Sequence, residues 1–214
     1  MDYKKIYDKD YFSGKTSFFW KFGYGRFASF YFNNTFKPIF RYTKKLKTGK
    51  VLDIGCAYGF MLQRFPASFK KFGIDVSEYA INVAKKRLPL AIFKAINIEG
   101  KLPFREDFFD VILFNDVLEH LKNPKIALEN IRKILKSGGI LYITTPNLNL
   151  VRKNIYKYAD EKEHHISLFS HRDLMKLLEN QGFKIAEHWT FLNFFVYAKF
   201  KSNIGTESGF ICKK

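Results

Sequence analysis

The stretch VLDIGCAYGF, residues 51–60, constrains the fold of this chain more than any other. Val51, Leu52 and Ile54 form strands readily, and Gly55 and Gly59 follow at once. Glycines after a buried strand let the backbone approach a ligand closely, beside the N-terminus of the next helix. The spacing is G-x-x-x-G, and Ala57 stands where the G-x-G-x-x-G dinucleotide fingerprint has its middle glycine. The loop therefore indicates a ligand site without naming the ligand.

An acidic residue at the end of the next predicted strand narrows the choice of ligand. Asp75 ends the run FGID, 20 residues after Gly55. An acid in this place can accept hydrogen bonds from both hydroxyls of a ribose, and it repels a 2′-phosphate. Asp75 could instead serve only as a negative charge at the N-terminus of the next helix. That helix already has Ser77 as its N-cap, so this role is less needed. We therefore expect Asp75 to bind a ribose.

Alternating strand and helix patterns predict the fold class. Ser77, Pro124 and Ser170 mark the starts of three helical segments that lie between apolar runs. Such alternation is typical of an α/β protein with a mostly parallel sheet and helices on both faces. We expect seven strands, at residues 51–54, 72–74, 91–95, 111–114, 140–144, 185–192 and 195–200.

The composition changes near residue 50. Residues 1–50 contain 12 Lys and Arg against three Asp, and 16 of the 39 aromatic residues. We expect residues 1–48 to form a helical, aromatic lid that also binds a substrate. Residues 49–214 should form the core, which carries the ligand-binding loop and Asp75.

The chain carries a strong positive charge. Lys and Arg number 37 against 20 Asp and Glu, which gives a net charge of +17. Such an excess favours an anionic partner, either a membrane surface or a nucleic acid, reached through the basic N-terminal segment. The alternative is a solvated surface without such a partner, and both interpretations stay open. The pattern indicates no obligate protein partner.

The cysteines and the apolar runs indicate the cellular compartment in which this protein works. Cys56 and Cys212 cannot form a disulfide scaffold, and their spacing matches no common metal motif. No apolar run approaches the length of a membrane span, and the first residues lack the pattern of a signal peptide. We therefore expect a cytoplasmic protein, with attachment to a membrane surface as the open alternative.

Four segments in order carry a family resemblance. Residues 51–147 closely resemble a class I S-adenosylmethionine-dependent methyltransferase with its Rossmann-like fold. The similar group is the small-molecule one that includes ubiquinone-biosynthesis O-methyltransferases. The one departure is Ala57 for the usual glycine, and alanine is small enough for binding to survive. The segments are VLDIGCAYGF, GIDVSEYAINVAKKR, LPFREDFFDVILFNDVLEHLKNP and ALENIRKILKSGGILYITTPN.

The resemblance implies S-adenosyl-L-methionine as cofactor and a role for each binding residue. Asp75 would hold the ribose, Val76 would pack on the adenine, and Asn97 would meet the adenine edge. Tyr11 would form a roof, since an aromatic face suits a sulfonium cation. The complete set implied for the cofactor is Tyr11, Asp53, Gly55, Ala57, Tyr58, Gly59, Asp75, Val76, Asn97, Ile98, Asn115, Asp116 and Val117.

An acidic acceptor also needs a base with a pKa near neutrality. By resemblance, His120 and His165 face the cleft, and we expect them to be the catalytic residues. Asp116, Glu119 and His120 also resemble a divalent-metal site of some quinone O-methyltransferases. Close spacing alone does not make three such groups converge, so we expect no metal.

Three functions compete on this evidence. The leading hypothesis is an S-adenosylmethionine-dependent methyltransferase that methylates an oxygen or nitrogen of a small-molecule or lipid-like acceptor. The second is a basic protein that binds nucleic acid or a membrane surface and has a methyltransferase-like fold without turnover. The third, a nicotinamide dehydrogenase, is disfavoured because G-x-G-x-x-G is missing.

Overall fold

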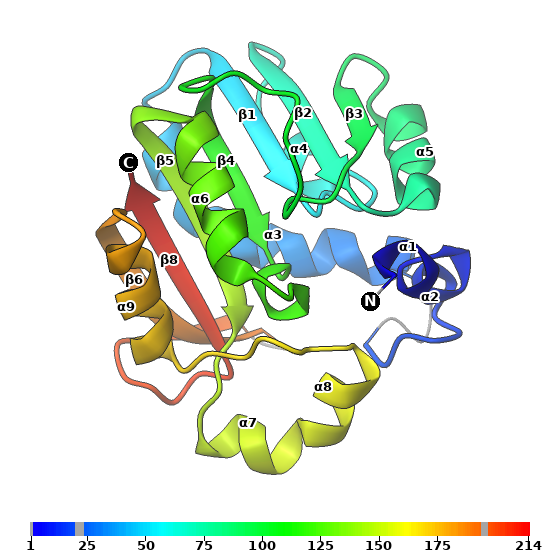
Figure 1. Ribbon diagram of the computed structural model, residues 1–214, viewed down its shortest axis with the longest axis vertical. Coiled ribbons are helices and arrows are strands. Elements are labelled where there is room, and N and C mark those ends of the chain that lie inside the picture. The colour runs from blue at the N-terminus through cyan, green and yellow to red at the C-terminus, as the bar shows by residue number, and fades with distance from the viewer. Residues whose placement is uncertain (1, 20–23, 194–196) are drawn as a thin grey trace.

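One mixed sheet of eight strands forms the centre of the fold (Figure 1). The computed structural model describes residues 2–19, 24–193 and 197–214. The strand order is β3-β2-β1-β4-β5-β8-β6-β7, and the pairs from β3 to β5 are parallel. The strands are β1 (Gly49–Ile54), β2 (Phe69–Asp75), β3 (Ile92–Ala95), β4 (Phe109–Asn115), β5 (Leu135–Pro146), β6 (Lys184–Asn193), β7 (Tyr197–Phe200) and β8 (Glu207–Lys213).

Helices cover both faces of this sheet (Figure 1). Neighbouring strand residues point to opposite faces, so Val51 packs in one hydrophobic cluster and Leu52 in the other. The first cluster includes α3, α4 and α5, and the second includes α6 and α9. The helices are α1 (Tyr3–Ile6), α2 (Lys9–Ser13), α3 (Tyr24–Thr43), α4 (Phe60–Gln63), α5 (Glu78–Arg87), α6 (Pro124–Ile134), α7 (Leu150–Ile155), α8 (Lys157–Lys162) and α9 (His171–Asn180), with a 3₁₀ turn η1 (Leu118–His120).

The predicted fold class is confirmed, but the prediction of seven strands is wrong. The additional strand is β8, which lies between β5 and β6 and is antiparallel to both. No strand was predicted for this segment. Its Gly209 is needed for packing, since a Cβ there would lie 2.5 Å from Cε2 of Trp189. The strand predicted at 195–200 corresponds to β7 (Tyr197–Phe200). Residues 195 and 196 of that prediction lie outside the described part of the chain.

The N-terminal helices lie on the side of the sheet to which the arrowheads of β1, β2 and β4 point (Figure 1). The Tyr142 hydroxyl of β5 donates a hydrogen bond to the Thr35 carbonyl of α3, at 2.5 Å. Tyr3, Phe12 and other residues of this segment share a hydrophobic cluster with the sheet. The segment therefore covers the carboxyl ends of the central strands, where open α/β sheets bind ligands. Whether it acts as a unit divided from the core at residue 48 stays a prediction.

Two short helices, α7 and α8, lie between β5 and α9 in the sequence and below the sheet in Figure 1. Asn149 caps α7, because its side chain accepts a hydrogen bond from the amide of Arg152. In the described part of the chain, no helix is both long and apolar enough to cross a membrane.

Candidate functional site

The loop between β1 and α4 turns through three residues with positive φ. Gly55, Ala57 and Gly59 have φ angles of 72°, 44° and 78°. Glycine adopts this conformation freely, whereas alanine pays roughly 1 kcal/mol for it. The departure at Ala57 therefore costs some stability, while the course of the loop is kept.

Gly55 is required for a second reason, which is the closeness of the neighbouring strand end. A Cβ at Gly55 would lie 2.2 Å from Cγ2 of Val117, which follows β4. Any side chain here would displace Val117, so the bare backbone lets the ends of β1 and β4 approach each other.

Asp75 holds this loop in place from the end of β2. Its Oδ2 accepts a hydrogen bond from the Ala57 amide at 2.9 Å, and its Oδ1 accepts one from the Ser77 amide, also at 2.9 Å. Burial raises the pKa of Asp75, and these amide hydrogen bonds oppose that rise. Each carboxylate oxygen can accept a further hydrogen bond, which leaves capacity for ribose hydroxyls.

A cavity of about 390 Å³ extends from Asp75 past Gly55 to the end of β5. It is lined by residues that are far apart in the sequence, and aromatic rings of the N-terminal segment cover it. Twelve of the predicted site residues line it: Tyr11, Gly55, Ala57, Asp75, Val76, Asn97, Ile98, Asn115, Asp116, Val117, His120 and His165.

Three predicted cofactor residues lie outside this lining. Asp53 lines a small adjoining pocket with Gly55 and Asn115. Tyr58 stacks on Phe12, with ring centroids 5.2 Å apart, so its ring closes the loop from outside. Gly59 caps α4 at the back of the loop. Their predicted contacts with a cofactor stay predictions.

Two buried polar groups beside Gly55 suit a bound ammonium. The Asn115 side-chain nitrogen donates to Thr144 Oγ1, whereas its Oδ1 is buried and has no hydrogen-bond partner in the described structure. Burial raises the pKa of Asp53 well above its usual value, and the nearby Asp75 raises it further. An ammonium such as that of a methionine moiety would satisfy Asn115 Oδ1 and favour the ionised form of Asp53. The residues present therefore fit S-adenosylmethionine.

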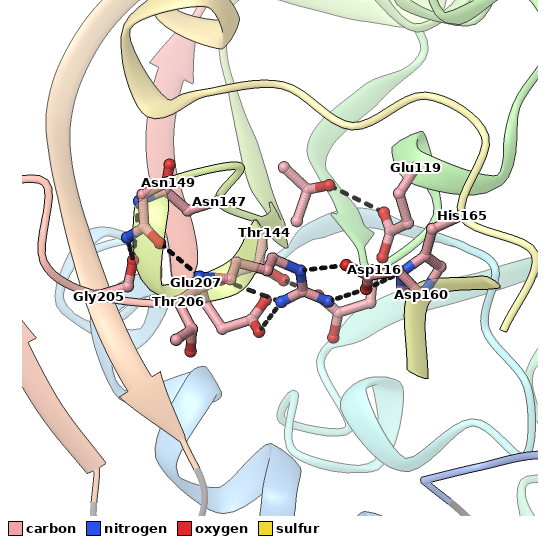
Figure 2. Close-up of polar contacts among 12 residues, drawn as sticks. Asp116, Glu119, Thr144, Asn147, Asn149, Asp160, His165, Gly205, Thr206 and Glu207 are labelled. Atoms are coloured by element: carbon pink, nitrogen blue, oxygen red, sulfur yellow. Dashed lines mark hydrogen bonds and ion pairs between the residues drawn. The ribbon is translucent and has the colours of Figure 1, made fainter. Parts of the chain in front are cut away.

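The other end of the cavity is organised around the buried side chain of Arg152, whose partners Asp160, Thr206 and Glu207 are labelled in Figure 2. Its Nε and Nη2 donate to the two oxygens of Asp160 at 3.1 and 2.5 Å. Its Nη1 donates to Glu207 Oε1 at 2.8 Å and to the Thr206 carbonyl at 3.1 Å. This one guanidinium thus joins α7, α8 and the start of β8.

Asp160 in turn orients His165. The distance from Asp160 Oδ1 to His165 Nδ1 is 2.7 Å. Burial alone would raise the pKa of Asp160, but the hydrogen bonds with His165 and Arg152 hold it below its ordinary value. An ionised Asp160 can accept a hydrogen bond from Nδ1 of His165, and this contact fixes the orientation of the ring.

His120 and Glu119 lie next to His165. The rings of His120 and His165 have centroids 4.8 Å apart, and His120 Nδ1 lies 2.8 Å from the Tyr7 hydroxyl. Burial lowers the pKa of His120 well below its usual value, and His165 lowers it further, so His120 is neutral at pH 7. Glu119, His120 and His165 each place one ligand atom within 4.8 Å of the others, a group that could hold a metal ion. The third member of this possible metal-binding group is therefore His165, whereas the sequence suggested Asp116.

Asp116 faces the middle of the cavity from the end of β4. It accepts hydrogen bonds from Tyr31 at 2.9 Å and from Thr144 at 3.0 Å. Burial raises its pKa, although these two hydrogen bonds oppose the rise. Burial likewise raises the pKa of Glu207 to about 8, with Arg152 opposing.

Glu163 fastens the N-terminal segment over the cavity. Its Oε2 accepts a hydrogen bond from the Tyr11 hydroxyl at 2.8 Å. Its Oε1 accepts from Ser17 Oγ at 2.7 Å and from the amides of Phe18 and Phe19 at 2.5 and 3.0 Å. Only 1% of Glu163 is exposed, so one buried carboxylate holds residues 11–19.

The glycine loop, the acid at the end of β2 and the cavity at the carboxyl ends of the strands define a Rossmann-like class I methyltransferase fold with a site for S-adenosylmethionine. Residues 27–188 match the family model described as Methyltransferase domain, and the chain belongs to this family. It is therefore an S-adenosylmethionine-dependent methyltransferase, and family membership does not favour a binding protein without turnover.

Sequence relatives point in the same direction. An uncharacterized protein of Methanocaldococcus jannaschii is 30% identical over 146 residues, which cover 66% of this chain and 67% of that protein. A ubiquinone biosynthesis O-methyltransferase of Pelagibacter ubique is 36% identical over 113 residues, covering 50% of this chain and 46% of that protein. The alignment thus spans about half the length of this O-methyltransferase.

Solved structures share the fold. One is a methyltransferase from Thermotoga maritima described as a possible histamine N-methyltransferase, with a TM-score of 0.67 and 22% identity, covering 89% of this chain and 94% of that one. Another is phosphoethanolamine N-methyltransferase 2 from Haemonchus contortus in complex with S-adenosyl-L-methionine, with a TM-score of 0.60 and 21% identity, covering 72% of this chain and 38% of that one.

Several residues that build the site carried no signal in the sequence. Arg152, Glu163 and Glu207 lie in segments without a motif, and only the strand order brings them together. Tyr7 and Tyr31 belong to the aromatic N-terminal segment, where the sequence suggested a lid but not which rings face the cavity.

Proposed function

We propose that this methyltransferase acts on a small-molecule or lipid-like acceptor bound at the end of the cavity away from Asp75, and methylates an oxygen or a nitrogen. The observation that supports this most is one continuous cavity with Asp75 at one end and the Asp160–His165 pair at the other. A cofactor held at Asp75 and the loop would point its reactive end toward Asp116 and the histidines.

When bound, S-adenosylmethionine supplies an electrophilic methyl group, which is transferred by in-line displacement. The chain's task is then to place the acceptor atom and remove its proton. His165 is suited to this task, because Asp160 holds its Nδ1 proton and leaves Nε2 to accept one. His120 is neutral and next to His165, so it can accept a hydrogen bond from the acceptor or pass the proton on.

The same proposal assigns the cofactor contacts. Asp75 would bind the ribose hydroxyls, while Val76, Asn97 and Ile98 would surround the adenine. Asn115 and Asp53 would meet the ammonium, and Tyr11 would close over the sulfonium with Glu163 holding its hydroxyl. We also propose a cytoplasmic location, which the two buried free thiols of Cys56 and Cys212 support.

Methyl transfer from labelled S-adenosylmethionine to fractions of a cell extract tests the function. We expect label in a small-molecule or lipid fraction, and His165→Gln should lower turnover about 10²- to 10⁴-fold with little change in cofactor affinity. Asp160→Asn should lower it as well, whereas His164→Asn at the exposed neighbouring position should not. Failure to bind S-adenosylhomocysteine would refute the cofactor site, and full turnover in His165→Gln would refute the base.

A further inference from the structure

The acceptor end of the cavity is unusually acidic for this chain. Asp116, Glu119, Glu163 and Glu207 line it, whereas Arg152 is the one Lys or Arg among the lining residues of the described structure. The chain as a whole carries a net charge of +17. We call this end of the cavity, lined by Asp116, Glu119, Glu163 and Glu207, the chamber. Its acidic lining and the net positive charge of the chain need separate explanations.

The positive charge of Arg152 is already used. Its guanidinium is bonded to the carboxylates of Asp160 and Glu207, so it neutralises at most one of these two charges. Glu163 is satisfied by hydrogen bonds from the neutral groups of residues 11–19 and has no remaining demand.

Glu119 is left without a full set of donors. Its Oε2 accepts a hydrogen bond from Thr145 Oγ1 at 2.9 Å. Its Oε1 lies 4.0 Å from His120 Nε2, beyond hydrogen-bond distance, and the backbone amide of Glu119 also bonds to the carboxylate. Only 1% of the side chain is exposed, yet it lines the cavity. Thr145 is the one side-chain donor to this carboxylate among the described residues, and a buried carboxylate on a cavity wall favours a ligand that donates hydrogen bonds or carries positive charge.

The remaining walls suit the same ligand. Tyr7, Tyr31 and Tyr156 line this end of the cavity, and the Tyr31 hydroxyl is directed to Asp116. Aromatic faces attract cations, and the effect grows when the cation is removed from water. In the view of Figure 2, Glu119 lies near His165 and Glu207 lies on the opposite side of Asp116.

We propose that the acceptor is an amine, which enters as an ammonium ion beside Glu119 and is methylated on nitrogen. The inference rests on the methyl transfer proposed above. The ammonium first gives one proton to His165 Nε2, and the nitrogen lone pair then attacks the methyl carbon. The carbon–sulfur bond breaks, its electron pair stays on sulfur, and the positive charge passes from sulfur to the methylated nitrogen.

The electrostatics of the chamber favour this reaction over attack by an anionic oxygen. Burial raises the pKa of Asp116, Glu119 and Glu207, and a positive charge on the acceptor nitrogen favours their ionised forms, which then stabilise that charge. A phenolate in the same place would disfavour their ionised forms and would be repelled by them. The chamber therefore selects by charge in both the ground state and the transition state.

Binding of three probes of similar size tests the inference. The protein is saturated with S-adenosylhomocysteine, with a chelator present, and titrated near neutral pH with phenethylammonium, 2-phenylethanol and 3-phenylpropionate. We expect the cation to bind about tenfold or more tightly than the alcohol, and the anion to bind worst. Glu119→Gln should lower the preference for the cation about tenfold, and Glu207→Gln should lower it less. Glu129→Gln, an exposed change of equal charge on α6, should leave it unchanged.

The outcomes separate the two proposals. Without binding of S-adenosylhomocysteine, the proposed function itself fails. If that ligand binds to wild type and to Glu119→Gln alike, both proteins are folded. The amine inference is then refuted if the cation binds no better than the alcohol or does not bind, if the preference requires added Mg²⁺, or if Glu119→Gln keeps it.

Discussion

Glu163→Gln should release the N-terminal segment from the cavity. Four donors on Tyr11, Ser17, Phe18 and Phe19 converge on this carboxylate. A hydrogen bond to a charged group contributes about 1.5–3 kcal/mol, and the four share two oxygens, so their contributions do not add fully. Glutamine keeps one acceptor oxygen and loses the charge. We therefore expect the free energy of opening this segment to fall by about 2–4 kcal/mol.

Hydrogen exchange reports this opening directly, because the amides of Phe18 and Phe19 are themselves donors to Glu163. Their exchange should become about 30- to 900-fold faster in Glu163→Gln, with less effect on the amides of β4. Glu161→Gln, an exposed change two residues away, is the matched control. Unchanged exchange at Phe18 and Phe19 in Glu163→Gln would show that the segment is held by its ring packing alone, and the reasoning would be wrong.

Four other predictions follow from the site. Ala57→Gly should raise the free energy of unfolding by about 0.5–1 kcal/mol in urea, because it relieves a positive φ. Asp75→Ala should weaken S-adenosylhomocysteine binding about ten- to a hundredfold by calorimetry, and equal affinity would refute the ribose assignment. The pKa of Glu207 is about 8 in the folded state against 4.5 ordinarily, so the native state holds its proton longer and stability should fall as pH rises from 4.5 to 8. Glu207→Gln should remove this fall in urea titrations at several pH values. If the basic N-terminal segment binds an anionic surface, its affinity for anionic vesicles or single-stranded nucleic acid should fall steeply from about 50 to 200 mM salt, and charge-neutral changes at Lys5, Lys15 and Lys37 should flatten that slope.

The cofactor half of the site was predictable because its residues follow directly on strands. Gly55 follows β1, Asp75 and Asn115 end β2 and β4, and parallel neighbouring strands bring their carboxyl ends to one edge. A short apolar run marks each of these strands, which are buried on both faces, so the strand ends could be located. Local pattern was enough to predict both the fold class and this edge.

The acceptor half depends on contacts between distant segments. Arg152 and Glu207 are 55 residues apart and meet because β8 lies beside β5. The sequence of β8 gave no clear alternation, since Gly209 is there to make room for Trp189. Glu163 is likewise joined to Tyr11, which lies 152 residues away in the chain. No periodicity encodes such pairings, so these residues could not be placed from the sequence.

The closeness of Gly55 and Val117 couples the substitutions that evolution can accept at two positions 62 residues apart in the chain. A Cβ at 55 would lie 2.2 Å from Cγ2 of Val117, so neither position can gain volume alone. A substitution at 55 becomes sterically possible only after 117 has become smaller, and it then still carries the strain of a φ of 72°. The order of mutational steps is therefore restricted, and related chains should vary at these two positions together. In this chain a larger residue at 117 would close the space that the glycine keeps open.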